Sequence, residues 1–151
     1  MQLNQATDYA FRAVLHLAKL PHNTIVNGQT LAEKEQIPQR FLLKIMRSLT
    51  GAGIIKSYRG VDGGFSLAKE AGEITLLSVI EAMEGTLSIH RCLAERSACH
   101  KNCTYQCPVH DALESVQDQL VFALANIDFA SLTQGGNREG RGSPRLFAAC
   151  K

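Results

Sequence analysis

The succession of residue patterns between positions 5 and 68 restricts the fold more than any other feature of this chain. Apolar residues recur at helical spacing in three segments, which cover residues 5–19, 29–36 and 38–49. Two short runs of β-type residues follow at 54–68, around a turn that contains Asp62, Gly63 and Gly64. Helix, turn, helix and then hairpin is the order of a winged helix-turn-helix domain. We therefore predict a mainly α protein with a small β-hairpin.

The first helical segment has one apolar face and a polar start. Its apolar residues lie at helical spacing from Tyr9 to Ala18, which predicts one buried face. Thr7 and Asp8 stand where an N-terminal cap and a first-turn acid belong. We expect these two residues to begin the helix.

The third helical segment separates apolar from basic side chains. The apolar set, which we expect to be buried, is Phe41, Leu42, Ile45, Met46 and Leu49. Arg40, Lys44 and Arg47 fall on the opposite face. A helix fits the major groove of DNA, where such residues reach phosphates or guanine edges. Gln39 and Arg40 lie at the N-terminal end, which usually points at the bases.

The predicted hairpin adds Tyr58 and Arg59 beside glycines. A slim, glycine-rich wing would let Arg59 enter a narrow minor groove. The same residues would also suit a solvated helix face and a plain hairpin. The basic helix face and the glycine-rich hairpin together favour DNA binding through Gln39, Arg40, Lys44, Arg47, Tyr58 and Arg59.

The distribution of charge agrees with this interpretation. The net charge of the chain is only +2, but residues 1–60 carry eight Lys or Arg against three Asp or Glu. Residues 61–151 carry eight against eleven. A basic N-terminal half favours a surface that meets phosphate, although ordinary surface solubility would give the same asymmetry.

Other classes of protein find little support. No run of about 18 apolar residues occurs, and the first residues lack the pattern of a signal peptide. We therefore expect no membrane partner and a cytoplasmic location, where thiols stay reduced. We also expect no enzyme, because the chain has no glycine-rich phosphate loop and no nucleophile–base pair outside its cysteine-rich stretch.

The C-terminal half contains two more helical patterns. Residues 75–84 predict a fourth helix, and residues 108–130 predict a long one. The long helix has an a/d pattern formed by Val109, Leu113, Val116, Leu120, Ala123 and Ile127. We favour a homodimer seam over packing onto the same subunit. The resulting division is a DNA-binding domain at 1–85, a cysteine-rich loop at 86–107, a dimerisation helix at 108–132 and a flexible tail at 133–151.

Soft ligands are concentrated between the two halves. Four cysteines and one histidine fall within nineteen residues, namely Cys92, Cys99, Cys103, Cys107 and His110. The only other cysteine in the chain is Cys150. Their spacing lacks the paired Cys-x2-Cys of zinc ribbons, which disfavours zinc without excluding it. Iron–sulfur clusters accept longer and mixed Cys/His loops. His16, His22 and His90 are interpreted as ordinary surface or packed histidines.

Four stretches together resemble the IscR/NsrR family of bacterial winged-helix regulators. They are TDYAFRAVLHLA at 7–18, the segment 37–68, the cysteine loop, and CPVHDAL at 107–113. The resemblance covers about residues 1–132. It implies a homodimer that binds a double-stranded DNA operator and holds an iron–sulfur cluster, [2Fe–2S] or in some nitric-oxide sensors [4Fe–4S].

The resemblance also implies a ligand set of Cys92, Cys99, Cys107 and His110. Cys103 is a rival for the middle position, because this loop has four cysteines where the family usually has three. Asp8 matches the acid that NsrR-like members use as the fourth ligand, whereas His110 matches the IscR-like histidine. Leu43 stands where IscR-like members have an acid on the recognition helix, which argues against their dual-site DNA discrimination here.

The implied function is a repressor that senses iron–sulfur cluster status and controls cluster-assembly genes. Two alternatives remain: a nitric-oxide or iron-responsive repressor of the NsrR type, and a zinc-binding or thiol-redox protein without a DNA role.

Overall fold

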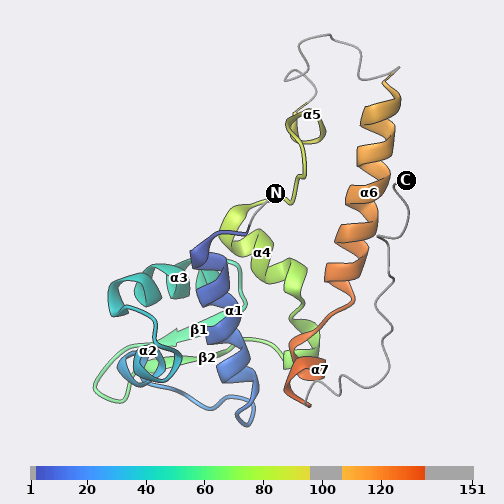
Figure 1. Cartoon of the computed structure of the whole chain (residues 1–151). Coiled ribbons are helices and arrows are strands. Elements are labelled where there is room, and N and C mark those ends of the chain that lie inside the picture. Colours follow the sequence, from blue (N-terminus) through green and yellow to red (C-terminus); the bar gives the residue numbers. More distant parts are fainter. Residues whose placement is uncertain (1–2, 96–106, 135–151) are drawn as a thin grey trace, which may run out of the picture.

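Three helices and a two-stranded hairpin form the N-terminal part of the computed structural model, which describes residues 3–95 and 107–134 (Figure 1). The elements in chain order are α1 (Gln5–Ala18), α2 (Gly28–Glu35), α3 (Gln39–Gly51), β1 (Ile55–Tyr58) and β2 (Gly64–Leu67). The strands are antiparallel, with Ile55 opposite Leu67 and Tyr58 opposite Gly64. This order confirms the predicted winged helix-turn-helix fold.

Five helical elements make up the rest of the described chain: η1 (Ala71–Glu73), α4 (Leu76–Glu84), α5 (Arg91–Ala94), α6 (Pro108–Ala125) and α7 (Phe129–Thr133). The single helix predicted over 108–130 is therefore wrong at its C-terminal end. The Asn126 side chain donates to the carbonyl of Phe122 (2.7 Å), and the Asp128 side chain accepts from the backbone N–H of Ser131 to begin α7. Such local polar bonds compete with helix continuation. Among the described residues, no helix is long and apolar enough to cross a membrane.

The hydrophobic core lies between α1, α3 and α4, with α7 packed against α1. Small residues on α1 let the other helices approach closely, since Ala10 and Ala13 are fully buried. The prediction that Phe41 is buried is wrong: its side chain is 42% exposed, and the guanidinium of Arg40 lies 5.3 Å from its ring centre. The other four predicted apolar residues of α3 are buried.

The first turn of α1 is joined to the end of α4. Asn4 is the N-cap, because its side chain accepts from the N–H of Thr7 at 2.9 Å. Thr7 is therefore not the predicted cap; it is fully buried, and its hydroxyl donates to the carboxylate of Glu84. The backbone N–H of Asn4 donates to the same carboxylate at 3.0 Å. A carboxylate at a helix N-terminus is favourable because it faces the positive end of the helix dipole.

The chain after α6 is attached to the core beside the start of α4. The N–H of Leu76 donates to Ile127, and the N–H of Phe129 donates to Ile74, both at 2.9 Å. The Phe129 side chain is 1% exposed, and its ring centre lies 6.4 Å from that of Phe11 on α1. These contacts fix the base of α6 on the winged helix-turn-helix domain.

Close backbone contacts at the start of β2 require glycine. The N–H of Val26 donates to Phe65 and the N–H of Phe65 donates to Val26, both at 2.9 Å. A Cβ atom on Gly64 would lie only 2.3 Å from the carbonyl oxygen of Val26. The segment before α2 therefore presses directly on β2.

Replacing Gly64 should accordingly disrupt the hairpin. Gly64→Ala is expected to lower the free energy of unfolding by roughly 2 kcal/mol or more, because the methyl group meets backbone that cannot move aside. Gly51→Ala is the control, since nothing lies within 4 Å of the added Cβ. It should leave stability unchanged or raise it by up to about 1 kcal/mol. Urea unfolding followed by circular dichroism measures both, and equal stability of the two variants would contradict this account.

Candidate DNA-binding surface and cysteine site

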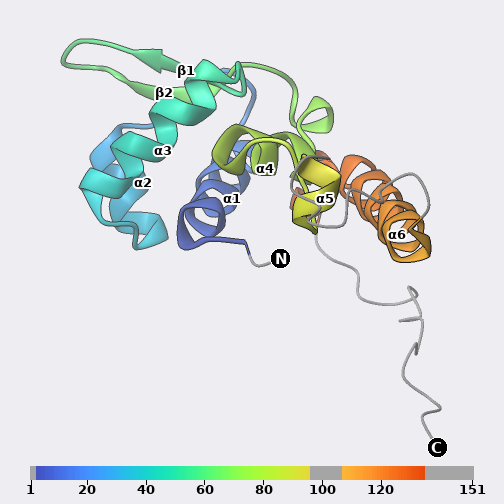
Figure 2. The same cartoon turned by 90° about the horizontal axis from the view of Figure 1, so that it is seen from above.

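The outer face of α3 presents the predicted polar and basic residues. Gln39, Arg40, Lys44 and Arg47 are all exposed. The opposite face is fixed in the core, because Leu42, Ile45 and Leu49 are at most 1% exposed. Burial of one face holds the helix rigidly, so its basic side chains are displayed on a stable support. Figure 2 shows the hairpin extending beside α3.

A groove connects α3 with the hairpin and brings two arginines together. It has a volume of about 380 Å³, and its lining consists of Leu43, Met46, Arg47, Thr50, Ser57, Arg59 and Phe65. Arg47 comes from α3, whereas Arg59 follows β1. Within the described chain neither guanidinium forms a salt bridge. Both charges are therefore free to meet phosphate.

Two apolar side chains on α3 extend this surface beyond the residues predicted from sequence. Leu43 is 52% exposed and Phe41 is 42% exposed. An exposed apolar side chain in the major groove can contact the methyl group of thymine. The exposure of Leu43 could have been predicted from the sequence, because Leu43 stands directly before Lys44 on the polar side of the helix. Val61, between the strands, is 97% exposed.

The cysteine site begins where α5 meets α6. The sulfur of Cys92, on α5, lies 3.4 Å from Nδ1 of His110, on α6. His110 is only 7% exposed. The contact joins residues eighteen positions apart, and it places one predicted cysteine ligand beside the predicted histidine ligand.

Cys107 lies directly before the first residue of α6. It is the N-cap residue, Pro108 follows it, and no side chain caps the free N–H groups of this helix end. Cys92 and Cys107 are both free thiols. A thiolate at a helix N-terminus is stabilised by those N–H groups.

His90 is the residue that the sequence interpretation missed. Its Nδ1 lies 3.1 Å from the sulfur of Cys92, closer than His110 does. The available signal was the His-x-Cys spacing, which places both side chains at the start of one short helix. Cys99 and Cys103 lie outside the described residues. Within 3–95 and 107–134, no three His, Cys, Asp or Glu side chains are arranged as a metal site.

Asp8 has a local partner instead of a position in this site. Its carboxylate lies 3.6 Å from Nε of Arg12, one turn further along α1, and its side chain is 64% exposed. The guanidinium of Arg12 also lies 4.9 Å from the ring centre of Tyr9.

The predicted seam on α6 is divided between two environments. Leu113, Leu120 and Ile127 are partly buried, and α6 contacts α4 and α5. Val109 and Val116 are 65% and 53% exposed, and Ala123 is exposed on the same side. We call Val109, Val116 and Ala123 the outer stripe. Phe122, elsewhere on the helix, is 72% exposed.

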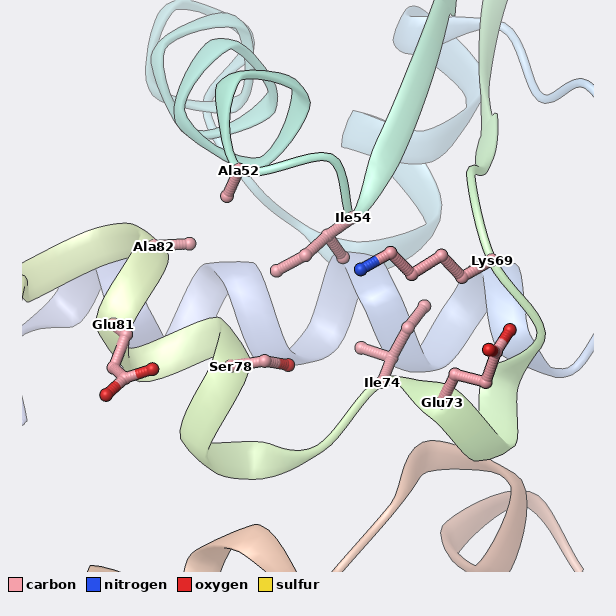
Figure 3. Close-up of a pocket in the computed structure, with 8 residues that line it drawn as sticks. All are labelled: Ala52, Ile54, Lys69, Glu73, Ile74, Ser78, Glu81 and Ala82. Carbon is pink, nitrogen blue, oxygen red and sulfur yellow. The ribbon is translucent and has the colours of Figure 1, made fainter.

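A separate pocket of about 290 Å³ lies between the end of α3 and α4 (Figure 3). The side chain of Lys69 extends into it beside Ile54 and Ile74, and Ser78 and Glu81 border it from α4. None of the predicted site residues lines this pocket.

Comparison with known proteins agrees with the fold. Residues 3–135 match the Rrf2 family, which is described as iron-dependent transcriptional regulators. The chain belongs to the Rrf2 family. A relative from Aquifex aeolicus (strain VF5), named as an HTH-type transcriptional regulator, is 32% identical over 120 residues, which are 80% of this chain and 83% of the relative.

Two solved Rrf2-like structures share the architecture. IscR from T. potens superposes with a TM-score of 0.66 at 21% identity, covering 95% of this chain and 94% of that one. The oxidised form of CymR from Staphylococcus aureus gives 0.68 at 22% identity, covering 91% and 99%. Rrf2 membership supports a DNA-binding regulator, and it disfavours a protein without a DNA role.

The groove of this Rrf2 protein gives a direct test of the DNA surface. Arg47→Ala and Arg59→Ala should each weaken binding and reduce the salt slope of log K by roughly one, because each removes one phosphate contact. Lys69→Ala is the control of equal charge, since Lys69 lies in the separate pocket. Fluorescence anisotropy on a duplex selected by the wild-type protein, from low to high salt, measures both quantities. An equal loss in Lys69→Ala would show a general charge effect.

Proposed function

We propose that this Rrf2 protein is a homodimeric repressor that senses iron–sulfur cluster status through a [2Fe–2S] cluster and controls cluster-assembly genes. Residues 1–85 would read DNA in the cytoplasm, 86–107 would hold the cluster and 108–132 would dimerise. The observation that carries the proposal is the 3.4 Å approach of the Cys92 sulfur to Nδ1 of His110. This contact joins two predicted ligands from separate helices.

The donor set fits such a cluster. Cys92 and Cys107 are free thiols, and His110 is largely protected from solvent. We propose Cys99 as the third cysteine ligand, with Cys103 as its rival. Three thiolates and one imidazole suit an iron–sulfur cluster. A bound cluster would be a group that changes redox state and that is lost when iron is scarce.

The fourth ligand is more consistent with His110 than with Asp8. His110 already lies beside Cys92, whereas Asp8 is paired with Arg12. In NsrR-like members the corresponding acid comes from the partner subunit. His110→Ala and Asp8→Ala would separate the two possibilities, because only the true ligand should alter the absorption spectrum of the loaded protein.

The same contacts suggest how the cluster would affect DNA binding. A cluster held by Cys92 and His110 would fix α5 against the start of α6, whose far end is attached to the core through Phe129. The orientation of α6 would then set the spacing of two recognition helices in a dimer. A ligand that favours one orientation shifts the equilibrium by a coupling free energy of typically about 1–3 kcal/mol.

Loading the protein with a cluster tests this proposal. Anaerobic reconstitution with iron and sulfide should give a coloured protein with equal iron and acid-labile sulfide, and Cys92→Ala should lose most of both. Cys150→Ala removes the one cysteine outside the loop and should load normally. A Cys92→Ala protein that retains the full iron and sulfide content would exclude the site.

Reactivity distinguishes the alternative functions. An NsrR-type sensor should lose its cluster spectrum and its DNA binding on exposure to nitric oxide, whereas a sensor of cluster status should respond to iron and sulfide supply. Metal analysis of protein purified without oxygen would reveal zinc in place of iron.

The outer stripe of α6 supports the proposed homodimer. A helix that leaves two valines more than half exposed gains free energy when a second copy covers them. Val116→Lys should therefore shift the protein toward monomer, since a charge would be buried in the seam. Ser115→Lys places the same charge one residue away on another face and should remain dimeric. Sedimentation velocity measures the outcome, and two equally dimeric variants would exclude this seam.

A further inference from the structure

Two imidazoles flank the sulfur of Cys92 at different distances. Nδ1 of His110 lies 3.4 Å away and Nδ1 of His90 lies 3.1 Å away. Ligands of one tetrahedral metal, with metal–sulfur and metal–nitrogen bonds of about 2.3 and 2.1 Å, lie about 3.6 Å from each other. The His110 distance is close to that value. The His90 distance is shorter than two ligands of one metal would give, so we interpret it as a direct hydrogen bond to sulfur.

The backbone around His90 is held in place by several hydrogen bonds. Its carbonyl accepts from the Ser88 hydroxyl at 2.8 Å and from the N–H of Leu93 at 3.0 Å. The N–H of Ile89 donates to the side chain of Gln117 on α6 at 3.1 Å. His90 is therefore positioned against both α5 and α6, and its ring is directed at Cys92.

Nδ1 of His90 has two possible partners on the same residue. It can accept from the backbone N–H of Cys92, at 3.3 Å, as the cap of α5. The tautomer with hydrogen on Nδ1 would instead donate to the sulfur. These uses exclude each other, because the atom carries either a hydrogen or a lone pair.

We propose that His90 is a positioning residue of the cluster site, whose Nδ1–H donates a hydrogen bond to the Cys92 sulfur while His110 is the iron ligand. This inference rests on the proposed function. A hydrogen bond to a ligating sulfur withdraws electron density from the iron, so it favours the reduced cluster. His90 therefore raises the reduction potential at which the sensor changes state.

The experiment compares four proteins reconstituted without oxygen: wild type, His90→Ala, His90→Ser and His110→Ala. Serine at position 90 can still cap α5 through its hydroxyl, so this variant removes the bond to sulfur while keeping the helix start. Three quantities are measured for each protein: the iron-to-sulfide ratio, the midpoint potential and the nitrogen hyperfine coupling of the reduced cluster. The coupling is measured in protein labelled with 15N-histidine. His22→Ala serves as a distant histidine control.

Both His90 variants should load as much iron and sulfide as wild type, retain the nitrogen coupling and show a lower midpoint potential. His110→Ala should lose the nitrogen coupling, and His22→Ala should match wild type. An unchanged potential in both His90 variants would overturn the inference, as would loss of the coupling in His90→Ala. A wild-type protein that takes up no cluster would overturn the proposed function itself, and with it this role of His90.

Discussion

The attachment of α7 to the winged helix-turn-helix core is the constraint on which the rest of the structure depends. Burial of Phe129 contributes on the order of 2–3 kcal/mol, and it places the end of α6 beside the start of α4. Without it, α6 would be held to the DNA-reading part mainly by its packing on α4 and by the backbone bonds of residues 127 and 128. With it, α6 is a rigid arm whose base is fixed and whose far end carries Cys107 and His110. The same helix therefore connects those two residues with the core that holds α3.

The cysteine site lies at the other end of α6. The chain between α4 and α6 returns past α6, where Gln117 binds the backbone of Ile89 and His110 contacts Cys92. Among the described residues these contacts are polar, whereas the base is held by a buried aromatic ring. In the proposed function, the far end is the part whose geometry a bound cofactor would change at small cost. This difference in strength is what a switch requires, since one end must stay fixed while the other moves.

The sequence pattern predicted the elements whose buried face follows from the spacing of their own apolar residues. The opposed apolar and basic faces of α3 follow from helical spacing, and the hairpin follows from its glycines. Some misses depend on contacts between distant segments, and others depend on local bonds. Thr7 bonds to Glu84 instead of capping its own helix, and α7 begins where Asp128 pairs with Thr75. Phe41 lies on the predicted apolar face but is exposed, and the guanidinium of its neighbour Arg40 lies over its ring. His90 was missed for a related reason, because its proximity to Cys92 comes from the cap of a four-residue helix that periodicity cannot detect.

The position of α4 explains how the two ends can affect each other. It packs on α1, α3 and α6 at once, and its last residue, Glu84, accepts hydrogen bonds from the start of α1. Gly85 follows at φ +82°, a backbone conformation that suits glycine, and redirects the chain toward the cysteine segment. In the proposed function, a displacement of that segment would act first on the end of α4, where a single carboxylate joins two helices. Because the buried faces of α1 and α3 share one core, such a displacement is opposed by close packing and would move α3 as a unit, which is how a change at one sulfur could reach the surface that meets DNA.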